Sequence, residues 1–218
     1  MMKGIAGTLV LCMAGALIAA PAAHAKKAKT ETPVAAPKAG GDALADEMTR
    51  YTTPGPQHQE LAELAGTWST RTRVWENPDA KPVEFAGNAE YRTILGGRFL
   101  QLDSRAQMNG AETHGISIYG YDAFKEKYSY FSIHDGETQA LTGLGDRDST
   151  SGAITFAVAM DMPMSGGHAV PIRAVLRRVS DNRHVFEIFE KYIDDREWKV
   201  IEITYDRRSA GPAAEGAR

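Results

Sequence analysis

The chain has 218 residues and a formal net charge of −3, with 25 basic and 28 acidic residues interspersed along it. It has no stripe of basic residues, so we expect no nucleic-acid partner. Its one cysteine, Cys12, lies near the N-terminus, and beyond it the chain has no thiol for disulfides, thiol catalysis or cysteine-based metal sites.

The N-terminus has the three parts of a secretory signal peptide. Lys3 supplies the basic start, an apolar run covers Ile5–Ala20, and small residues stand at Ala23 and Ala25. We predict that residues 1–25 are a signal peptide cut after Ala25. The mature protein is then exported, to the periplasm or outside the cell, and keeps no membrane span. An uncleaved anchor is the alternative, but the run is short for a span and glycines interrupt it.

Two segments flank a single ordered domain. Residues 26–53 are rich in Ala, Lys, Thr, Pro and Gly and cannot bury a core, so we predict a flexible linker with a transient helical turn over Asp42–Arg50. Residues 209–218 form a similar disordered tail. Residues 54–208 are long enough to bury a sizeable core without disulfides.

The domain is predicted to begin with a short helix. Leu61, Leu64 and Ala65 share one helical face, and Gly66 follows at the position where a glycine commonly ends a helix. A helix this short is marginal on its own, so we expect its leucines to pack against one end of the remaining fold.

From Trp68 onward the apolar residues recur at every second position, which predicts strands. Turn residues such as Gly96-Gly97 and Asn109-Gly110 separate the strands, and such short connections require antiparallel neighbours. Closing about ten strands removes exposed edges, so we predict an all-β fold, a single antiparallel meander barrel with the helix at one end. An open sandwich is the alternative. The predicted strands are Trp68–Trp75, Val83–Ile94, Arg98–Met108, Glu112–Tyr121, Lys127–His134, Thr138–Gly145, Ala153–Met160, Val170–Val179, Arg183–Ile193 and Trp198–Asp206.

Three motifs carry a resemblance to known families. They are His58-x-x-Leu61-x-x-Leu64-x-Gly66-Thr67-Trp68, Ile94-Leu95-Gly96-Gly97-Arg98-Phe99-Leu100 and Gly120-Tyr121-Asp122. The Gly-x-Trp element is similar to that of the calycins, the lipocalin-like small-molecule-binding barrels. The three motifs together more closely resemble a bacterial family known only as a domain of unknown function. The resemblance covers nearly all of residues 58–208 and implies a lipocalin-like barrel, with no established activity.

The resemblance also implies roles for three residues. In lipocalins the Gly-x-Trp tryptophan closes one end of the barrel beneath an arginine that follows the last strand. Trp68 has that place here, and we expect Arg207 or Arg208 to lie over its ring. Another ten-stranded relative, the nitrobindin type, binds haem through a histidine near its C-terminus. No histidine follows His184 in this chain, so we expect no haem and no other cofactor.

A barrel of this size can have a lumen wider than its own side chains fill, with room for a small ligand. The central and late strands carry many aromatic and acidic residues that could line it. Alternation alone does not say which face of each strand is the inner one. The candidate ligand contacts are Arg98, His114, Tyr121, Tyr130, Glu187 and Glu202. For Arg98, a charge at the rim of a hairpin turn is the simpler interpretation.

One pair of histidines raises the question of a metal site. His114 and His134 lie on neighbouring predicted strands. They face each other if Gly120 pairs with Tyr128, and they do not if Tyr121 pairs with Tyr128. The facing pair, with a carboxylate as third ligand, could bind zinc.

A second cluster combines thioethers with a histidine. Met162, Met164 and His168 fall in one segment, and thioethers suit Cu(I). Methionine more commonly fills apolar gaps, and histidines on strands are usually simple polar sites. We therefore expect no metal at either group and treat their residues as secondary candidates.

The chain lacks the Gly-x-Ser-x-Gly, His-Glu-x-x-His and phosphate-loop signatures of common hydrolases and nucleotide-binding proteins. We therefore predict an exported binding protein that holds a small, partly apolar molecule in its lumen. An enzyme that uses carboxylates or histidines of the lumen is one alternative. A structural protein of the cell envelope with a filled barrel is the other.

Overall fold

The fold was analysed in a computed structural model that describes residues 41–108, 110–161, 169–191 and 196–208. The predicted signal peptide over 1–25, the linker as far as residue 40 and the tail over 209–218 lie outside the described residues. The candidate copper ligands Met162, Met164 and His168 lie outside them as well.

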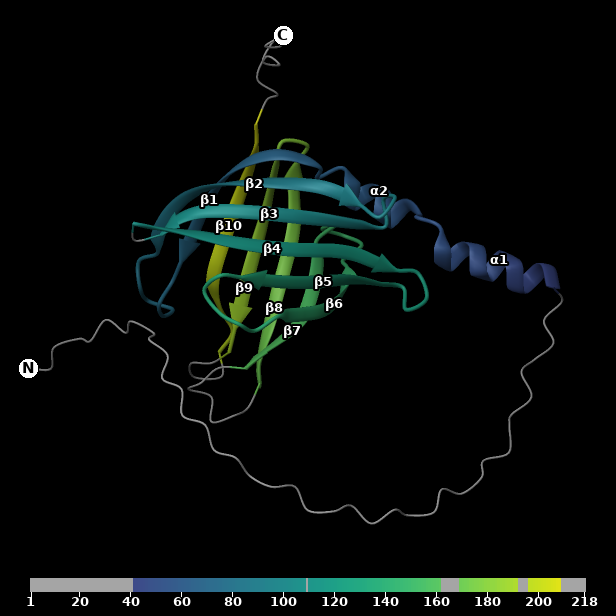
Figure 1. Ribbon diagram of the computed structural model, residues 1–218. Coiled ribbons are helices and arrows are strands. Elements are labelled where there is room, and N and C mark those ends of the chain that lie inside the picture. Colours follow the sequence, from purple (N-terminus) through teal and green to yellow (C-terminus); the bar gives the residue numbers. More distant parts are fainter. Residues whose placement is uncertain (1–40, 109, 162–168, 192–195, 209–218) are drawn as a thin grey trace, which may run out of the picture. The chain divides into compact units, whose positions relative to one another are not determined.

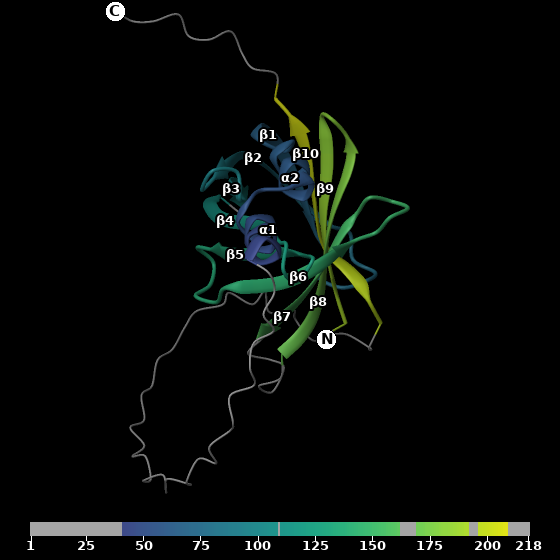
Figure 2. The same ribbon diagram turned by 90° about the vertical axis from the view of Figure 1, so that its right-hand side faces the viewer.

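Ten antiparallel strands form a closed barrel in which each strand pairs with its neighbours in sequence and β1 pairs with β10. The predicted meander barrel is confirmed, and the open sandwich is wrong. Figures 1 and 2 show strands of the first half of the chain crossing those of the second half. The strands are β1 (Gly66–Val74), β2 (Val83–Ile94), β3 (Phe99–Met108), β4 (Ala111–Asp122), β5 (Lys127–His134), β6 (Leu141–Arg147), β7 (Ile154–Asp161), β8 (Ala169–Ser180), β9 (Arg183–Glu190) and β10 (Trp198–Arg207).

The turn between β2 and β3 has a left-handed backbone, which explains its two glycines. Leu95, Gly96 and Gly97 follow one another with φ values of 50°, 67° and 83°. This left-handed backbone costs a glycine nothing, whereas a side chain there is strained. The predicted hairpin at Gly96-Gly97 is therefore present, with the chain reversing direction within a few residues.

Strand β6 begins three residues later than predicted, because a side chain takes the place of backbone pairing. The Gln139 amide donates to the Asp161 carbonyl and accepts from the Asp161 N–H, at 2.9 Å in each case. Gln139 thus satisfies the backbone N–H and C=O of Asp161, the last residue of β7, without itself lying in a strand. An amide side chain can replace a peptide group in this way because it carries the same donor and acceptor.

Helix α2 (Pro56–Ala62) packs against the end of the barrel where β1 begins. Leu61 and Leu64 are buried in the core, as the sequence predicts. Burying each leucine stabilises the fold by roughly 1.5–3 kcal/mol. His58 fixes the start of the helix, since its Nδ1 accepts a hydrogen bond from the Gly55 N–H at 3.0 Å.

A second helix, α1 (Gly41–Thr52), covers the end of the segment for which a flexible linker is predicted. It is longer than the transient turn expected over Asp42–Arg50. Two contacts join it to the barrel turns: Arg98 Nη2 donates to the Thr52 carbonyl at 2.5 Å, and the rings of Tyr51 and Phe124 lie 5.1 Å apart.

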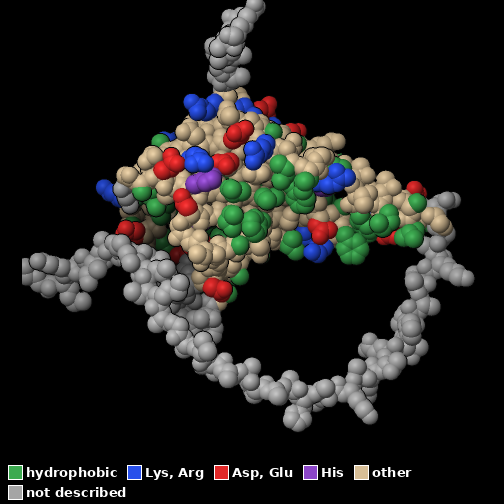
Figure 3. All heavy atoms as spheres, viewed as in Figure 1, with side chains coloured by type: hydrophobic (Ala, Val, Ile, Leu, Met, Phe, Trp, Pro, Cys, Tyr) green, Lys and Arg blue, Asp and Glu red, His purple; other side chains and the backbone are tan. Residues whose placement is uncertain are grey.

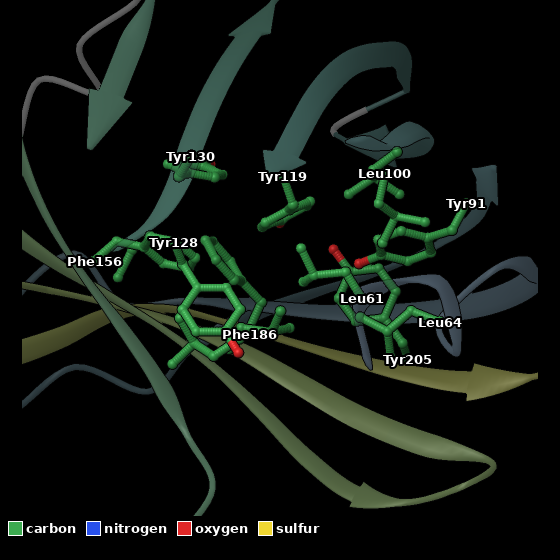
Figure 4. Packing of buried hydrophobic residues seen from close by; sticks show 14 of the residues in the cluster. Leu61, Leu64, Tyr91, Leu100, Tyr119, Tyr128, Tyr130, Phe156, Phe186 and Tyr205 are labelled. Atoms are coloured by element: carbon green, nitrogen blue, oxygen red, sulfur yellow. The ribbon is translucent and has the colours of Figure 1, made fainter. Parts of the chain in front are cut away.

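The α2 end of the barrel is filled by large side chains from facing strands (Figure 4). Trp68, Tyr91, Tyr119 and Tyr205 are each no more than 2% exposed. The Tyr91 ring centroid lies 6.3 Å from that of Tyr119 and 5.8 Å from that of Tyr205. Aromatic rings at these spacings bury much surface and attract one another, so this end is a packed core.

Trp68 closes this end together with Arg207. The Trp68 Nε1–H donates to the Leu64 carbonyl at 2.9 Å, and the Arg207 guanidinium lies 4.2 Å from the indole ring centre. The same guanidinium donates to the carbonyls of Ala65 and Glu63, at 2.7 Å each. It therefore covers the ring and satisfies the last carbonyls after helix α2 at once.

The position of Arg207 explains why the Gly-x-Trp element begins with a glycine. Gly66 has φ of 127°, and a Cβ added to it would lie 2.9 Å from Arg207 Nη1. Any side chain at residue 66 would displace the guanidinium. Arg208 has no such role, since it donates to Asn88 Oδ1 at 3.2 Å on the exposed surface.

Replacing Arg207 by lysine tests this closure. Lysine keeps the charge but loses the planar fork that reaches two carbonyls and covers the ring. We expect Arg207→Lys to lower the free energy of unfolding by about 2 kcal/mol. The control Arg208→Lys should change it by less than about 0.5 kcal/mol. Denaturant unfolding measures both, and equal losses would contradict the closing role of Arg207.

Candidate functional site

An open cavity of about 450 Å³ lies inside the barrel, toward the end where β1 stops and β10 starts. This size falls within the range of about 300–1,000 Å³ typical of ligand pockets. Six aliphatic side chains from five strands make up much of its wall: Leu102, Val158, Ile172, Ile188, Ile201 and Ile203. The cavity interior is therefore mainly apolar.

The cavity exists because β3, β4 and β5 place small residues on their inner face. Ser104 lies opposite Gly115, and Ser117 lies opposite Ser132. The Ser117 hydroxyl donates to the Ser132 hydroxyl at 3.0 Å, so the two polar groups satisfy each other. Their small side chains leave space in the lumen. Two residues further along β4, the Tyr119 ring fills the corresponding space.

Aromatic side chains of the core also form part of the cavity wall. Tyr119, Tyr130, Phe186 and Tyr205 line it from four strands. The Tyr130 ring lies 5.4 Å from Tyr119 and 5.6 Å from Phe186. Burial raises the pKa of the Tyr130 hydroxyl above its ordinary value, so the group stays protonated at neutral pH.

The mouth of the cavity carries an unpaired carboxylate. Glu190, at the end of β9, lies directly opposite Trp198 at the start of β10 and opposite Ile172 of β8, and all three line the cavity. Among the described residues the Glu190 carboxylate has no hydrogen bond or ion pair, and burial raises its pKa. The Trp198 Nε1–H is also buried, with no acceptor in the described part of the chain.

Further acidic groups stand around the same mouth. Glu76 and Glu137 line it from the loops that follow β1 and β5. Glu137 Oε1 lies 2.9 Å from Nε2 of His134, whose Nδ1 accepts a hydrogen bond from the Gly136 N–H at 3.1 Å. The Nε2–Oε1 distance is that of an ion pair, but the geometry is not that of a hydrogen bond, and Glu137 Oε1 is buried without a hydrogen-bond partner among the described residues.

Glu187 and Glu202, predicted as ligand contacts, lie on the outer face of the barrel. The inner positions of β9 are occupied by Phe186, Ile188 and Glu190, so Glu187 points outward. Glu202 is opposite Glu187 on β10 and shares its face. Lys199 Nζ donates to both carboxylates, at 3.0 Å to Glu187 Oε1. Both are thus paired surface groups, and their assignment to the lumen is wrong.

His114 also lies on the outer face, because the inner positions of β4 belong to Gly115, Ser117 and Tyr119. Its Nε2 is 3.1 Å from Asp103 Oδ1 on β3. Figure 3 shows this outer face, where side chains of both charges gather around a histidine. His114 and Glu187, a histidine and a carboxylate that were candidates for the lumen, therefore face away from the cavity.

The other three predicted contacts have three different outcomes. Tyr130 lines the cavity, as predicted. Tyr121 points inward but sits at the α2 end, 6.0 Å from the His58 ring and 5.1 Å from Tyr128, and does not line the cavity. Arg98 lies at the exposed β2–β3 turn and donates to the Leu95 and Thr52 carbonyls, which agrees with the simpler interpretation.

The strand register also decides the question of a histidine metal pair. Tyr121 pairs with Tyr128, so His134 lies opposite Gly115 and His114 lies beyond the paired residues. The His114 backbone N–H instead donates a hydrogen bond to Asp135 Oδ2 at 2.9 Å. The two imidazoles lie on opposite faces of the sheet and do not form a shared site. Within the described ranges no three His, Cys, Asp or Glu residues are grouped as metal ligands.

Sequence reasoning missed Glu190 and Trp198 at the mouth and the serines that create the cavity. The serines could have been found because, at every second position of β3 to β5, they share one face with large residues. That spacing marks one continuous inner face. Glu190 had a signal too, since it stands two and four residues from Ile188 and Phe186. Choosing that face over the one with Glu187 requires the pairing partners.

His184 is enclosed in the core beyond the cavity. It is fully buried, its ring stacks on Tyr205 at 4.3 Å, and its Nε2 lies 3.1 Å from the Tyr91 hydroxyl. Burial, with smaller contributions from the charges of Arg207 and Arg178, lowers its pKa to about 3. The imidazole is therefore neutral at pH 7 and acts as a packing group.

Together these features define a closed ten-stranded antiparallel β-barrel with a lumen open at one end. The chain belongs to a family of proteins of unknown function, DUF1579, whose sequence profile matches residues 53–207. No curated protein matches the chain.

Two solved structures are similar to this chain. One is Rv2717c from M. tuberculosis, with 13% sequence identity and a TM-score of 0.53, over 72% of this chain and 100% of that one. The other is a redesigned β-barrel with 13% identity and a TM-score of 0.36, over 68% of this chain and 95% of that one. The first likeness shows a shared fold and no more. Among the described residues, no helix is long and apolar enough to cross a membrane.

His184 predicts an acid sensitivity of the fold. Between its ordinary pKa of 6.5 and its folded pKa of about 3, the unfolded chain binds a proton that the folded chain does not. Stability therefore falls as pH decreases below 6.5, by roughly 1.4 kcal/mol per pH unit. From pH 6.5 to 4.5, wild type should lose about 2–3 kcal/mol more than His184→Gln, as measured by denaturant unfolding. Equal losses would show that His184 does not govern the pH dependence.

Proposed function

We propose that this protein is exported and binds a small, partly apolar molecule in the lumen of its barrel. The N-terminal sequence supports export, since Lys3, an apolar run and Ala23–Ala25 follow the pattern of a signal peptide. The observation that carries binding is the open cavity of about 450 Å³ with its mainly apolar wall.

The contrast between the two halves of the lumen supports a ligand more than a filled structural barrel. At the α2 end the inner positions carry Tyr91, Trp68 and Leu100, which pack to 2% exposure or less. At the other end the inner positions of β3, β4 and β5 carry serine and glycine. If tyrosines rather than serines lined this part of the wall, more apolar surface would be buried. A bound apolar molecule would recover that burial.

The closed end also agrees with the likeness to lipocalins. Trp68 under Arg207 blocks one end of the lumen, so a ligand would enter and leave at the end that carries Glu190. Two of the three tryptophans, Trp75 and Trp198, line this side of the lumen. Their fluorescence should therefore report an occupant directly.

Filling the cavity with a side chain tests the proposal. Ser132→Phe would place a ring in the lumen, while Ile133→Phe adds the same ring one residue further on the outer face, where Ile133 is 39% exposed. We expect wild type and Ile133→Phe to bind 1-octanol with similar affinity, followed by tryptophan fluorescence. Ser132→Phe should bind at least tenfold more weakly. A wild type that does not respond to 1-octanol, or equal binding by all three chains, would contradict a binding lumen.

A further inference from the structure

We infer that the ligand carries a positively charged amine on its apolar body, and that the carboxylates at the mouth of the lumen bind this amine. The inference rests on the proposed function, because it needs a lumen that takes a ligand. It adds to that function the position of the ligand's polar end and the sign of its charge.

The charges that line the cavity have one sign. Glu76, Glu137 and Glu190 line it, with His134 beside Glu137, and neither lysine nor arginine does so among the described residues. A carboxylate ligand would meet three like charges and no counter-ion. An ammonium group would meet only attraction.

Lys199, which follows Trp198 in the chain, is already paired on the other side of the wall. Lys199 Nζ donates to Glu187 and Glu202 on the outer face and lies 5.4 Å from the Trp75 ring centre. Arg73 likewise binds Glu202, at 3.2 Å. These cations pair with the outer carboxylates, and no hydrogen bond or ion pair joins Glu190 to any residue that the structure describes.

Glu190 is the group that a bound amine would complete. Its carboxylate lies inside the wall between Ile172 and Trp198 without an ion pair, and burial disfavours its charged form. A partly buried carboxylate with no partner is costly, and an ammonium within hydrogen-bond distance offsets that cost.

The residue opposite Glu190 adds an aromatic side chain to this end of the lumen. Trp198 is 9% exposed and lines the cavity, yet its Nε1–H has no acceptor among the described residues. This donor needs an acceptor, which an ammonium group does not have, so it does not bear on the sign of the ligand's charge. The indole rings of Trp198 and Trp75 also offer faces on which a cation binds favourably.

Three probes with one apolar body test the sign of the charge. Octylammonium, 1-octanol and octanoate have the same chain and differ only at the head group. Titrations into the full-length chain at pH 7, followed by tryptophan fluorescence, give a dissociation constant for each probe. We expect octylammonium to bind at least tenfold more tightly than octanoate, with 1-octanol between them.

Two glutamate-to-glutamine substitutions on β9 show which carboxylate causes the preference for octylammonium. Glu190→Gln should reduce the preference for octylammonium over octanoate to less than about threefold. Glu187→Gln removes a carboxylate three residues away on the outer face and should keep the full preference. Thermal unfolding of both variants shows whether each is folded.

The outcomes separate this inference from the proposed function. If 1-octanol binds in the lumen and octylammonium is not preferred, the inference is overturned while the binding lumen stands. If the preference is present but survives Glu190→Gln, the inference is also overturned. If no probe binds, the proposed function fails and the inference fails with it.

Discussion

The guanidinium of Arg207 over the ring of Trp68 is the contact on which the barrel's asymmetry depends. It joins the last strand to the first and to the carbonyls that follow helix α2, so one end of the barrel is closed by the two ends of the domain. The packed tyrosines beneath it extend that closure inward. The lumen is therefore open at the other end, where Glu190 and Trp198 stand at its mouth.

Strand alternation then determines which charges belong to the lumen. Along β9 the inner face ends in Glu190, and the outer face carries Glu187 paired with Lys199. The two glutamates are three residues apart and lie on opposite faces: Glu187 is paired with Lys199, and Glu190 lines the cavity with no partner among the described residues. A shift of one residue in the pairing would exchange them. The proposed specificity for an amine is thus a consequence of register.

The strands, the hairpin at Gly96-Gly97 and the Trp68–Arg207 closure were predictable from the sequence, because local patterns encode them. The inner face of each strand was not, because a period of two offers two faces and both contain apolar residues on these strands. His114, Glu187 and Glu202 were placed in the lumen for that reason. The late start of β6 was equally hidden, since it depends on a bond from the Gln139 side chain to Asp161 across the sheet.

The most direct test of a binding lumen is a methyl-resolved NMR titration of the full-length chain with 1-octanol. The account predicts saturable shifts of methyl groups that line the cavity, such as those of Val158, Ile172 and Ile203. Exposed methyl groups on the outside, such as those of Leu144 and Val179, should stay unchanged. Shifts only at the outer methyl groups, or none up to the solubility of the alcohol, would contradict a ligand site inside this barrel.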